Sequence, residues 1–186
     1  YSGFTLSAGT VNVNAPLALG TALGTVALNG GSINNTSGGA VVGTTAGAMT
    51  LGADLSFLGS GALTLPGAVT LAADRTITTS AVGGVGTANA LSLSGVLSGA
   101  FNLTKAGAGT LVLSAANTFG GAGKNLTLNA GVLAANHATN AFAAASTTLV
   151  INGGALDALI ASAPGNNLPQ TWGGDFAFIG TNTLNL

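Results

Sequence analysis

Short bursts of alternating apolar and polar residues recur along the whole chain, and most of them end at a glycine-containing corner. A period of two places side chains on opposite faces of a strand, so each burst predicts a β-strand of about three to five residues. Glycine lets the chain turn a corner without a Cβ clash. No window has the period of a sustained helix, and only Leu156 to Ala163 allows a helical turn. Clear strand–corner–strand examples are Leu28 to Ile33, Leu93 to Leu97, Leu128 to Leu133 and Ile151 to Leu156.

Strands this short and corners this frequent predict a coil in which each turn rests on the previous one. We therefore expect an all-β fold, a parallel β-helix (β-solenoid), that runs through residues 1–186 as one continuous segment. Strong bursts recur roughly every twenty residues, which is about one turn of such a coil. At ~20 residues per turn and ~4.8 Å between strands, the chain would make about nine turns and a rod roughly 43 Å long.

The composition fits a stacked coil and excludes several other classes of protein. Charged residues make up 4 % of the chain, against roughly 25 % in a typical soluble domain. The net charge of −1 gives no reason to expect binding to nucleic acid or to an anionic membrane. A mean hydropathy of +0.62 argues against disorder, and the absence of cysteine excludes disulfides and thiolate metal sites. The most apolar stretch, Ala141 to Ala163, is too interrupted to be a membrane-spanning helix.

The chain also predicts an internal repeat. Two sets of segments align at an offset of 121 to 123 residues throughout. We interpret residues 1–121 as a first copy and residues 122–186 as a partial second copy, within a longer repetitive protein. Trp172 stands where the first copy has Leu51, and is predicted to be a core residue or a local cover. The aligned segments are Phe4 to Gly9 with Leu126 to Gly131, Val26 to Gly31 with Leu149 to Gly154, and Asp54 to Phe57 with Asp175 to Phe178.

Two glycine-rich motifs hint at ligand binding, but their surroundings argue against it. The segment Ala122 to Asn125 contains Gly-Lys, as a phosphate-binding loop does. That loop also needs a glycine where Thr118 stands, and a serine or threonine where Asn125 stands. Gly83 to Gly86 lacks the strand–helix context of a dinucleotide site and predicts a loose turn. We expect no cofactor-binding residue in either segment.

The ionisable residues are few and lie far apart in the sequence. His137 is the only histidine, and its neighbours predict an exposed loop rather than a catalytic or metal site. Asp74 and Arg75 are interpreted as a local surface pair. Asp54 and Asp175 hold equivalent repeat positions just before a strand, so we expect them to cap turns. The prediction is therefore no catalytic residue, no metal ligand and no enzymatic activity.

In the middle of the chain, Leu97 to Gly121 resembles the autotransporter-associated β-strand repeat, also called the passenger-associated transport repeat. The shared pattern is Leu103 to Lys105, then the strand Gly107 to Ser114, then Asn117 to Gly120, with Phe119 where the family usually has tyrosine. The resemblance implies a right-handed parallel β-helix. It also implies a large secreted bacterial protein, and hence an extracellular or cell-surface location.

Three functions are open at this point. The first is a structural segment of a long extracellular fibre, stalk or surface protein, whose partner is itself or adjacent repeats stacked end to end. The second is an adhesin passenger module that binds another cell or a surface glycan through exposed polar ladders. The least favoured is a polysaccharide-active β-helix, because that chemistry needs clustered acidic groups in a groove.

Overall fold

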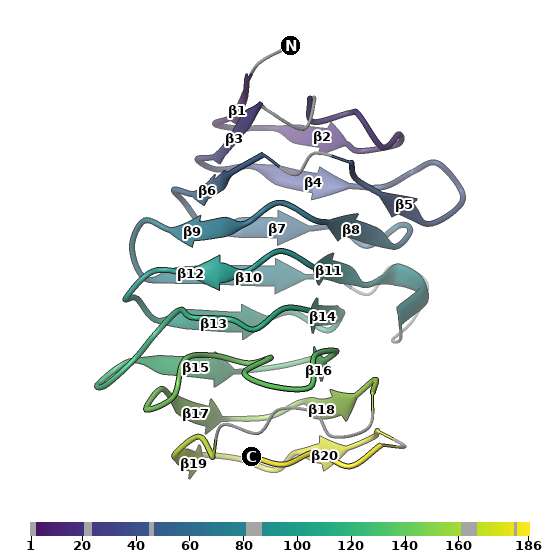
Figure 1. Ribbon diagram of the computed structural model, residues 1–186. Helices are drawn as coiled ribbons and strands as arrows, with labels where there is room; N and C mark the ends of the chain where they lie inside the picture. The colour runs from purple at the N-terminus through teal and green to yellow at the C-terminus, as the bar shows by residue number, and fades with distance from the viewer. Residues whose placement is uncertain (1–2, 21–23, 45–46, 81–86, 161–166, 181) are drawn as a thin grey trace.

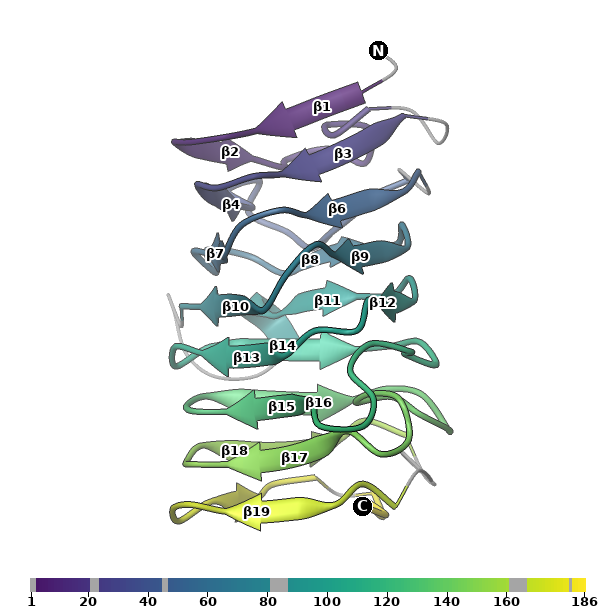
Figure 2. The same cartoon turned by 90° about the vertical axis from the view of Figure 1, so that its left-hand side faces the viewer.

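The structure, a computed structural model, describes residues 3–20, 24–44, 47–80, 87–160, 167–180 and 182–186. There the chain winds into a coil of about seven turns with about 22 residues per turn. Three sheets run along the coil: from β3 (Thr25–Leu28) to β14 (Thr110–Leu113) the chain passes from sheet A to sheet B and then to sheet C, and from β15 (Asn125–Leu128) on its strands alternate between sheets B and C (Figures 1 and 2). All the strand pairings of these residues are parallel, which confirms the predicted all-β parallel solenoid.

The three sheets differ in length. Sheet A has five strands, in the order β1 (Gly3–Leu6), β3 (Thr25–Leu28), β6 (Met49–Leu51), β9 (Val69–Leu71) and β12 (Leu97–Ser98). Sheet B has eight, in the order β2 (Thr10–Asn12), β4 (Ser32–Asn34), β7 (Leu55–Phe57), β10 (Arg75–Thr79), β13 (Leu103–Ala106), β15 (Asn125–Leu128), β17 (Thr148–Ile151) and β19 (Gln170–Trp172). Sheet C has seven, in the order β5 (Val41–Val42), β8 (Leu63–Leu65), β11 (Leu91–Leu93), β14 (Thr110–Leu113), β16 (Val132–Ala135), β18 (Ala155–Ala158) and β20 (Ala177–Phe178).

Inward-facing side chains of successive turns stack directly on one another and form the core. In sheet C, Leu63 pairs with Leu91, Leu91 with Leu111, and Leu111 with Leu133, and all four side chains are fully buried. Each buried leucine contributes about 1.5–3 kcal/mol. A charged residue in such a column would have to be desolvated between apolar neighbours, which explains why so few charges occur.

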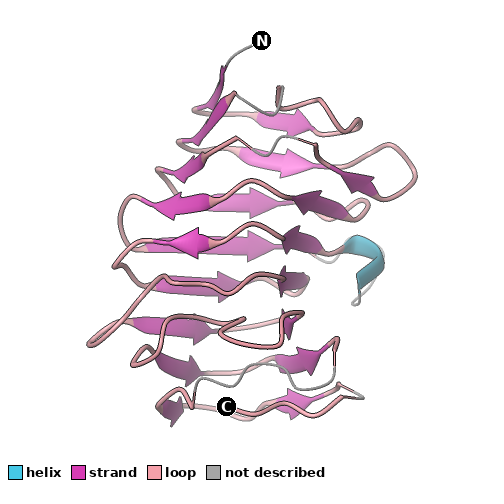
Figure 3. Cartoon of the chain, viewed as in Figure 1, coloured by secondary structure: helices cyan, strands magenta, loops and turns pink. Residues whose placement is uncertain are grey.

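One turn is longer than the others, and most turns exceed the expected ~20 residues. Leu63 and Leu91 lie 28 residues apart, whereas Leu91 and Leu111 lie 20 apart. The extra residues follow Ser80 and include a single 3-10 turn, η1 (Thr87–Asn89), which projects from the side of the coil (Figure 3). Because the turns are longer than ~20 residues, the expectation of about nine turns is wrong.

The expected helical turn at Leu156 to Ala163 is also wrong at its start, because Leu156 lies in strand β18. Residues 161–166 of that stretch lie outside the described residues. The alternation of Leu156 and Ala158, both buried, with half-buried Asp157 shows a strand period instead.

The predicted unit of about 121 residues stays a prediction, as does the right-handed sense of the coil. The structure places its aligned segments on different faces: β1 is in sheet A and β15 in sheet B, and the same holds for β3 with β17. The segments therefore share a strand–corner–strand pattern without sharing a sheet. Two copies of such a unit would be rotated by one face relative to each other.

The corner between sheets B and C shows why glycine is required there. Gly107, Gly131 and Gly154 all have positive φ, at 75°, 72° and 86°. A Cβ on Gly131 would collide with the carbonyl oxygens of Gly107 and Gly109 in the turn before. The backbones of neighbouring turns touch at this corner, so no side chain fits between them.

Asn117 continues the pairing of turns where sheet A ends. Its Oδ1 accepts a hydrogen bond from the backbone N–H of Leu97 in β12 (2.8 Å), and its Nδ2 donates to the carbonyl of Ala141 one turn further on. The side chain is 1 % exposed. One buried amide thus connects three turns at a place where the chain forms no strand.

We expect Gly131→Ala to destabilise the protein more than Gly123→Ala. Both glycines have φ of 72°, so both variants carry the left-handed backbone strain of about 1–2 kcal/mol. Only Gly131 faces backbone atoms, whereas a Cβ on Gly123 meets nothing within 4 Å. Urea unfolding followed by circular dichroism measures the difference. Equal losses in the two variants would show that the corner has room for a side chain.

We expect Asn117→Ala to lower the unfolding free energy by about 3 kcal/mol, because it leaves a buried N–H and a buried carbonyl without partners. Asn14→Ala is the matched control. Asn14 exchanges two hydrogen bonds with Thr36 in the next turn, at 2.7 and 2.8 Å, but at an exposed position. Its loss should stay below about 1 kcal/mol, since water replaces the lost bonds. Similar losses in both would contradict a special role for Asn117.

Candidate functional site

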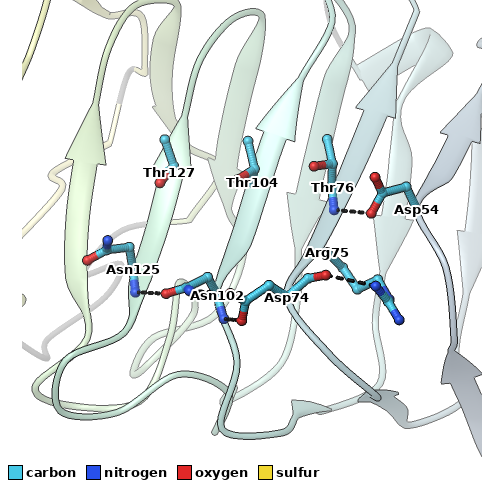
Figure 4. A pocket seen from close by; sticks show the side chains of 8 residues that line it. All are labelled: Asp54, Asp74, Arg75, Thr76, Asn102, Thr104, Asn125 and Thr127. Atoms are coloured by element: carbon cyan, nitrogen blue, oxygen red, sulfur yellow. Dashed lines mark hydrogen bonds between the residues drawn. The ribbon is translucent and has the colours of Figure 1, made fainter.

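A shallow polar hollow of about 350 Å³ lies on the outer face of sheet B. It crosses four neighbouring strands, β7, β10, β13 and β15, and therefore runs along the coil rather than along any one strand (Figure 4). Outward-facing positions of a strand point away from the core, which is why polar residues collect there. The lining residues are Asp54, Asp74, Arg75, Thr76, Asn102, Thr104, Asn125 and Thr127.

A ladder of acidic and amide side chains forms one side of the hollow. Asp74 accepts hydrogen bonds from Asn102 through both oxygens, from the backbone N–H at 2.9 Å and from Nδ2 at 2.7 Å. Asn102 in turn accepts from the backbone N–H of Asn125 at 2.8 Å. Asp54 accepts from the N–H of Thr76 at 2.8 Å. Asp54 therefore caps a strand of the next turn, and each of these acceptors joins two turns of the coil.

Hydrogen bonding sets the charge state of Asp74. The backbone N–H of Asn102, then its side-chain amide, lower the pKa of the Asp74 carboxyl, and the positive charges of Lys124 and Arg75 lower it further. Burial acts in the opposite direction and is outweighed. The ionised form of Asp74 is thus stabilised, and it already accepts two hydrogen bonds from Asn102.

Arg75 does not form the surface ion pair that its position beside Asp74 predicts. Its guanidinium donates to three backbone carbonyls: Nε to Leu51 at 3.2 Å, one terminal nitrogen to Gly52, and the other to Asp74 at 2.9 Å. Arg75 therefore clamps its own turn to the previous one. Its positive charge is directed into backbone oxygens.

The other residues singled out from the sequence do not converge on this hollow. His137 is half-buried rather than fully exposed as predicted, and its Nδ1 lies 2.6 Å from the carbonyl oxygen of Thr139 in its own loop. Gly83 to Gly86 lie outside the described residues. Trp172 is 68 % exposed on β19 and packs edge-to-face against Phe176, so it acts as a cover and is not a core residue. Across the described ranges, no three His, Cys, Asp or Glu residues gather as metal ligands.

The most unusual residue is a buried lysine. Lys105 stands in the core column of sheet B, between Ile77 and Leu128, and is 0 % exposed. Its Nζ donates to the carbonyl oxygens of Ala106 and Gly107, each at 2.8 Å, and to that of Ala130 in the next turn at 3.0 Å. These three bonds connect two turns at the corner between sheets B and C. Burial lowers the pKa of Lys105 to about 8.

The sequence carried a signal for this burial. In β13, Leu103 and Lys105 are two residues apart and so point to the same side of the strand, toward the core. The resemblance to the repeat does not by itself place this lysine in the core. The charge of Lys105 alone favours a position on the surface. Inside the coil, the carbonyls of Gly107 and Ala130 accept hydrogen bonds from its ammonium group and stabilise it there.

The pKa of Lys105 predicts how stability depends on pH. Between about pH 8 and 10.5, the unfolded chain keeps a proton that the folded chain has released, so the unfolding free energy rises with pH. The total rise is about 3 kcal/mol. Urea unfolding at intervals from pH 7 to 10.5 measures it. Lys105→Met should remove the rise and Lys124→Met, at a half-exposed position, should keep it. A wild-type curve without a rise in this range would contradict the prediction.

Comparison with known proteins agrees with the fold. Residues 103–135 match the model of the passenger-associated-transport-repeat. No curated protein and no solved structure matches the chain. In the part of the chain that the structure describes, no helix has the length and apolar character needed to cross a bilayer. The matched segment begins at β13 with Leu103, and includes Lys105 and Asn117. Residues 103–135 are therefore similar to a passenger-associated transport repeat, and they lie on a parallel β-solenoid.

Proposed function

We propose that this chain is a structural segment of a long bacterial surface protein, in which stacked turns set the length and stiffness of a stalk or fibre. The proposal starts from two observations: a segment that matches the passenger-associated-transport-repeat, and a β-solenoid fold. Repeats of this type belong to secreted autotransporter passengers, which supports an extracellular or cell-surface location. The further step, from a solenoid segment to a stalk or fibre, is our proposal.

The observation that carries the proposal is how the motif residues are used. Lys105 bonds carbonyls of two turns, Asn117 connects three turns, and Gly107 allows two backbones to touch. These three residues of the repeat therefore act where neighbouring turns meet. Residues used in this way support a mechanical role, because they resist separation of the turns.

A non-enzymatic role is part of the same proposal. A polysaccharide-active site needs acidic groups that are free to exchange protons with a substrate. Here Asp74 accepts two hydrogen bonds from Asn102, and Asp54 accepts one from the backbone of Thr76. Arg75 is committed to carbonyls. These groups are better placed to join turns than to perform chemistry.

End-to-end stacking is the proposed mode of assembly. Strand β19 lies at one end of sheet B and pairs on one side with β17. Near it, large apolar side chains are exposed: Trp172 at 68 %, Phe178 at 47 % and Ile179 at 53 %. A further turn, from the same chain or from another copy, would pair with this edge and bury these side chains. Native surface material should then form rods.

Electron microscopy and mass determination on native bacterial surface material test the proposed function. We expect rods or fibres much longer than the roughly 34 Å that about seven turns span. Short isolated particles with a full-length mass near 17.5 kDa would overturn the stalk or fibre proposal.

Sedimentation of the purified chain tests non-covalent stacking. Trp172→Lys should reduce assembly at high protein concentration, because it places a charge at the open edge of β19. Val96→Lys is the control, because Val96 is also exposed, at 39 %, but lies between β11 and β12, away from this edge. Assembly that is lost equally in both variants would show that the contact is lateral.

A further inference from the structure

The floor of the polar hollow is a column of threonine hydroxyls. Thr76, Thr104 and Thr127 pair with one another in register on β10, β13 and β15, and all three side chains are half-buried. Within the described part of the chain, none of the three hydroxyls has a hydrogen-bond partner. Figure 4 shows them side by side above the acidic and amide ladder. The column repeats at the strand spacing of about 4.8 Å.

The side of the hollow adds acceptors, and its lining residues include no cation that is free to bind a ligand. Asp54 uses Oδ1 for the N–H of Thr76, so its second oxygen has no partner among the described contacts. The amide of Asn125 is exposed at the end of the ladder. Arg75, the only cation among the lining residues, donates to backbone carbonyls. An anionic ligand would meet two carboxylates, and Lys124, whose charge already acts on Asp74, lies outside the lining residues.

These features fit an extended, uncharged ligand that is rich in hydroxyl groups. We propose that the hollow binds a linear neutral polysaccharide, which lies along the coil and exchanges hydrogen bonds with Thr76, Thr104 and Thr127. Each hydroxyl of threonine both donates and accepts, as the hydroxyls of a sugar do. The free oxygen of Asp54 accepts from a further sugar hydroxyl. This binding role goes beyond the structural function and does not depend on end-to-end assembly.

Calorimetric titration of the purified chain tests the proposal. The probes are hexasaccharides of β-1,4-glucose, of β-1,4-N-acetylglucosamine and of β-1,4-mannose, with an oligogalacturonate as the anionic probe and a chitosan oligomer as the cationic one. We expect at least one neutral hexasaccharide to bind and the oligogalacturonate not to bind. Binding should persist in moderate salt, because no charge pair is involved.

Variants assign the binding to the hollow. Thr104→Val and Thr127→Val remove one hydroxyl each, keep the β-branched shape that a strand prefers, and should each weaken binding about tenfold. Thr50→Val is the matched control, because Thr50 is exposed and faces outward from β6 in sheet A; it should leave affinity unchanged. Circular dichroism confirms folding, and either variant of the pair is sufficient for the test.

Several results would overturn the proposal. The first is that no neutral hexasaccharide binds. The second is that Thr104→Val, Thr127→Val and the wild type bind with equal affinity. The third is that only the chitosan oligomer binds and that salt abolishes this binding. A fourth is a change in the sedimentation of both hollow variants without sugar, which would make the face an interface between copies of this chain. Failure here leaves the rod-forming function intact, because that function is tested by particle length and not by sugar binding.

Discussion

Parallel stacking of equivalent positions is the constraint on which the rest of this molecule depends. Each residue of a strand lies directly above a residue about one turn away, as Leu91 lies between Leu63 and Leu111. A substitution therefore changes the contacts with the turn before and with the turn after. Each position must hold a residue that suits both neighbours. Apolar residues meet that requirement in the core, and Thr and Asn meet it outside, where they can hydrogen-bond along the coil. The low charge of the chain follows from the same constraint.

The exceptions to this rule occur where the backbone supplies the missing partners. Lys105 interrupts an apolar column, but the carbonyls of Ala106, Gly107 and Ala130 surround its ammonium group. Asn117 is buried where sheet A ends, and its amide replaces the pairing that a strand would provide. Both residues lie in the segment that matches the passenger-associated transport repeat. In this segment, Lys105 and Asn117 thus hold neighbouring turns together by hydrogen bonds.

The outer face of sheet B combines two roles in one place. The acids and amides of the ladder are engaged with the main chain of the next turn, so they stabilise the stack. The hydroxyls of Thr76, Thr104 and Thr127 beside them make no hydrogen bond within the described part of the chain, so they are left to the solvent. A regular row of threonine hydroxyls therefore lies beside the ladder. That row is the surface with which an uncharged, hydroxyl-rich polymer can interact.

The sequence by itself determined the class of fold, because strand periodicity and corner glycines are local properties. Leu111 and Leu113 could be assigned to the core, and Asp54 to a cap, from their positions in these patterns. The number of turns could not be read in this way, because extra residues lengthen most turns beyond ~20, and one turn near Thr87 to 28, without disturbing the strand pattern. Only the tertiary structure placed Lys105 inside, turned Arg75 toward backbone carbonyls, and brought Asp74 beside Asn102, 28 residues later. Such contacts join different turns, and which residues meet depends on the length of each turn rather than on any local pattern.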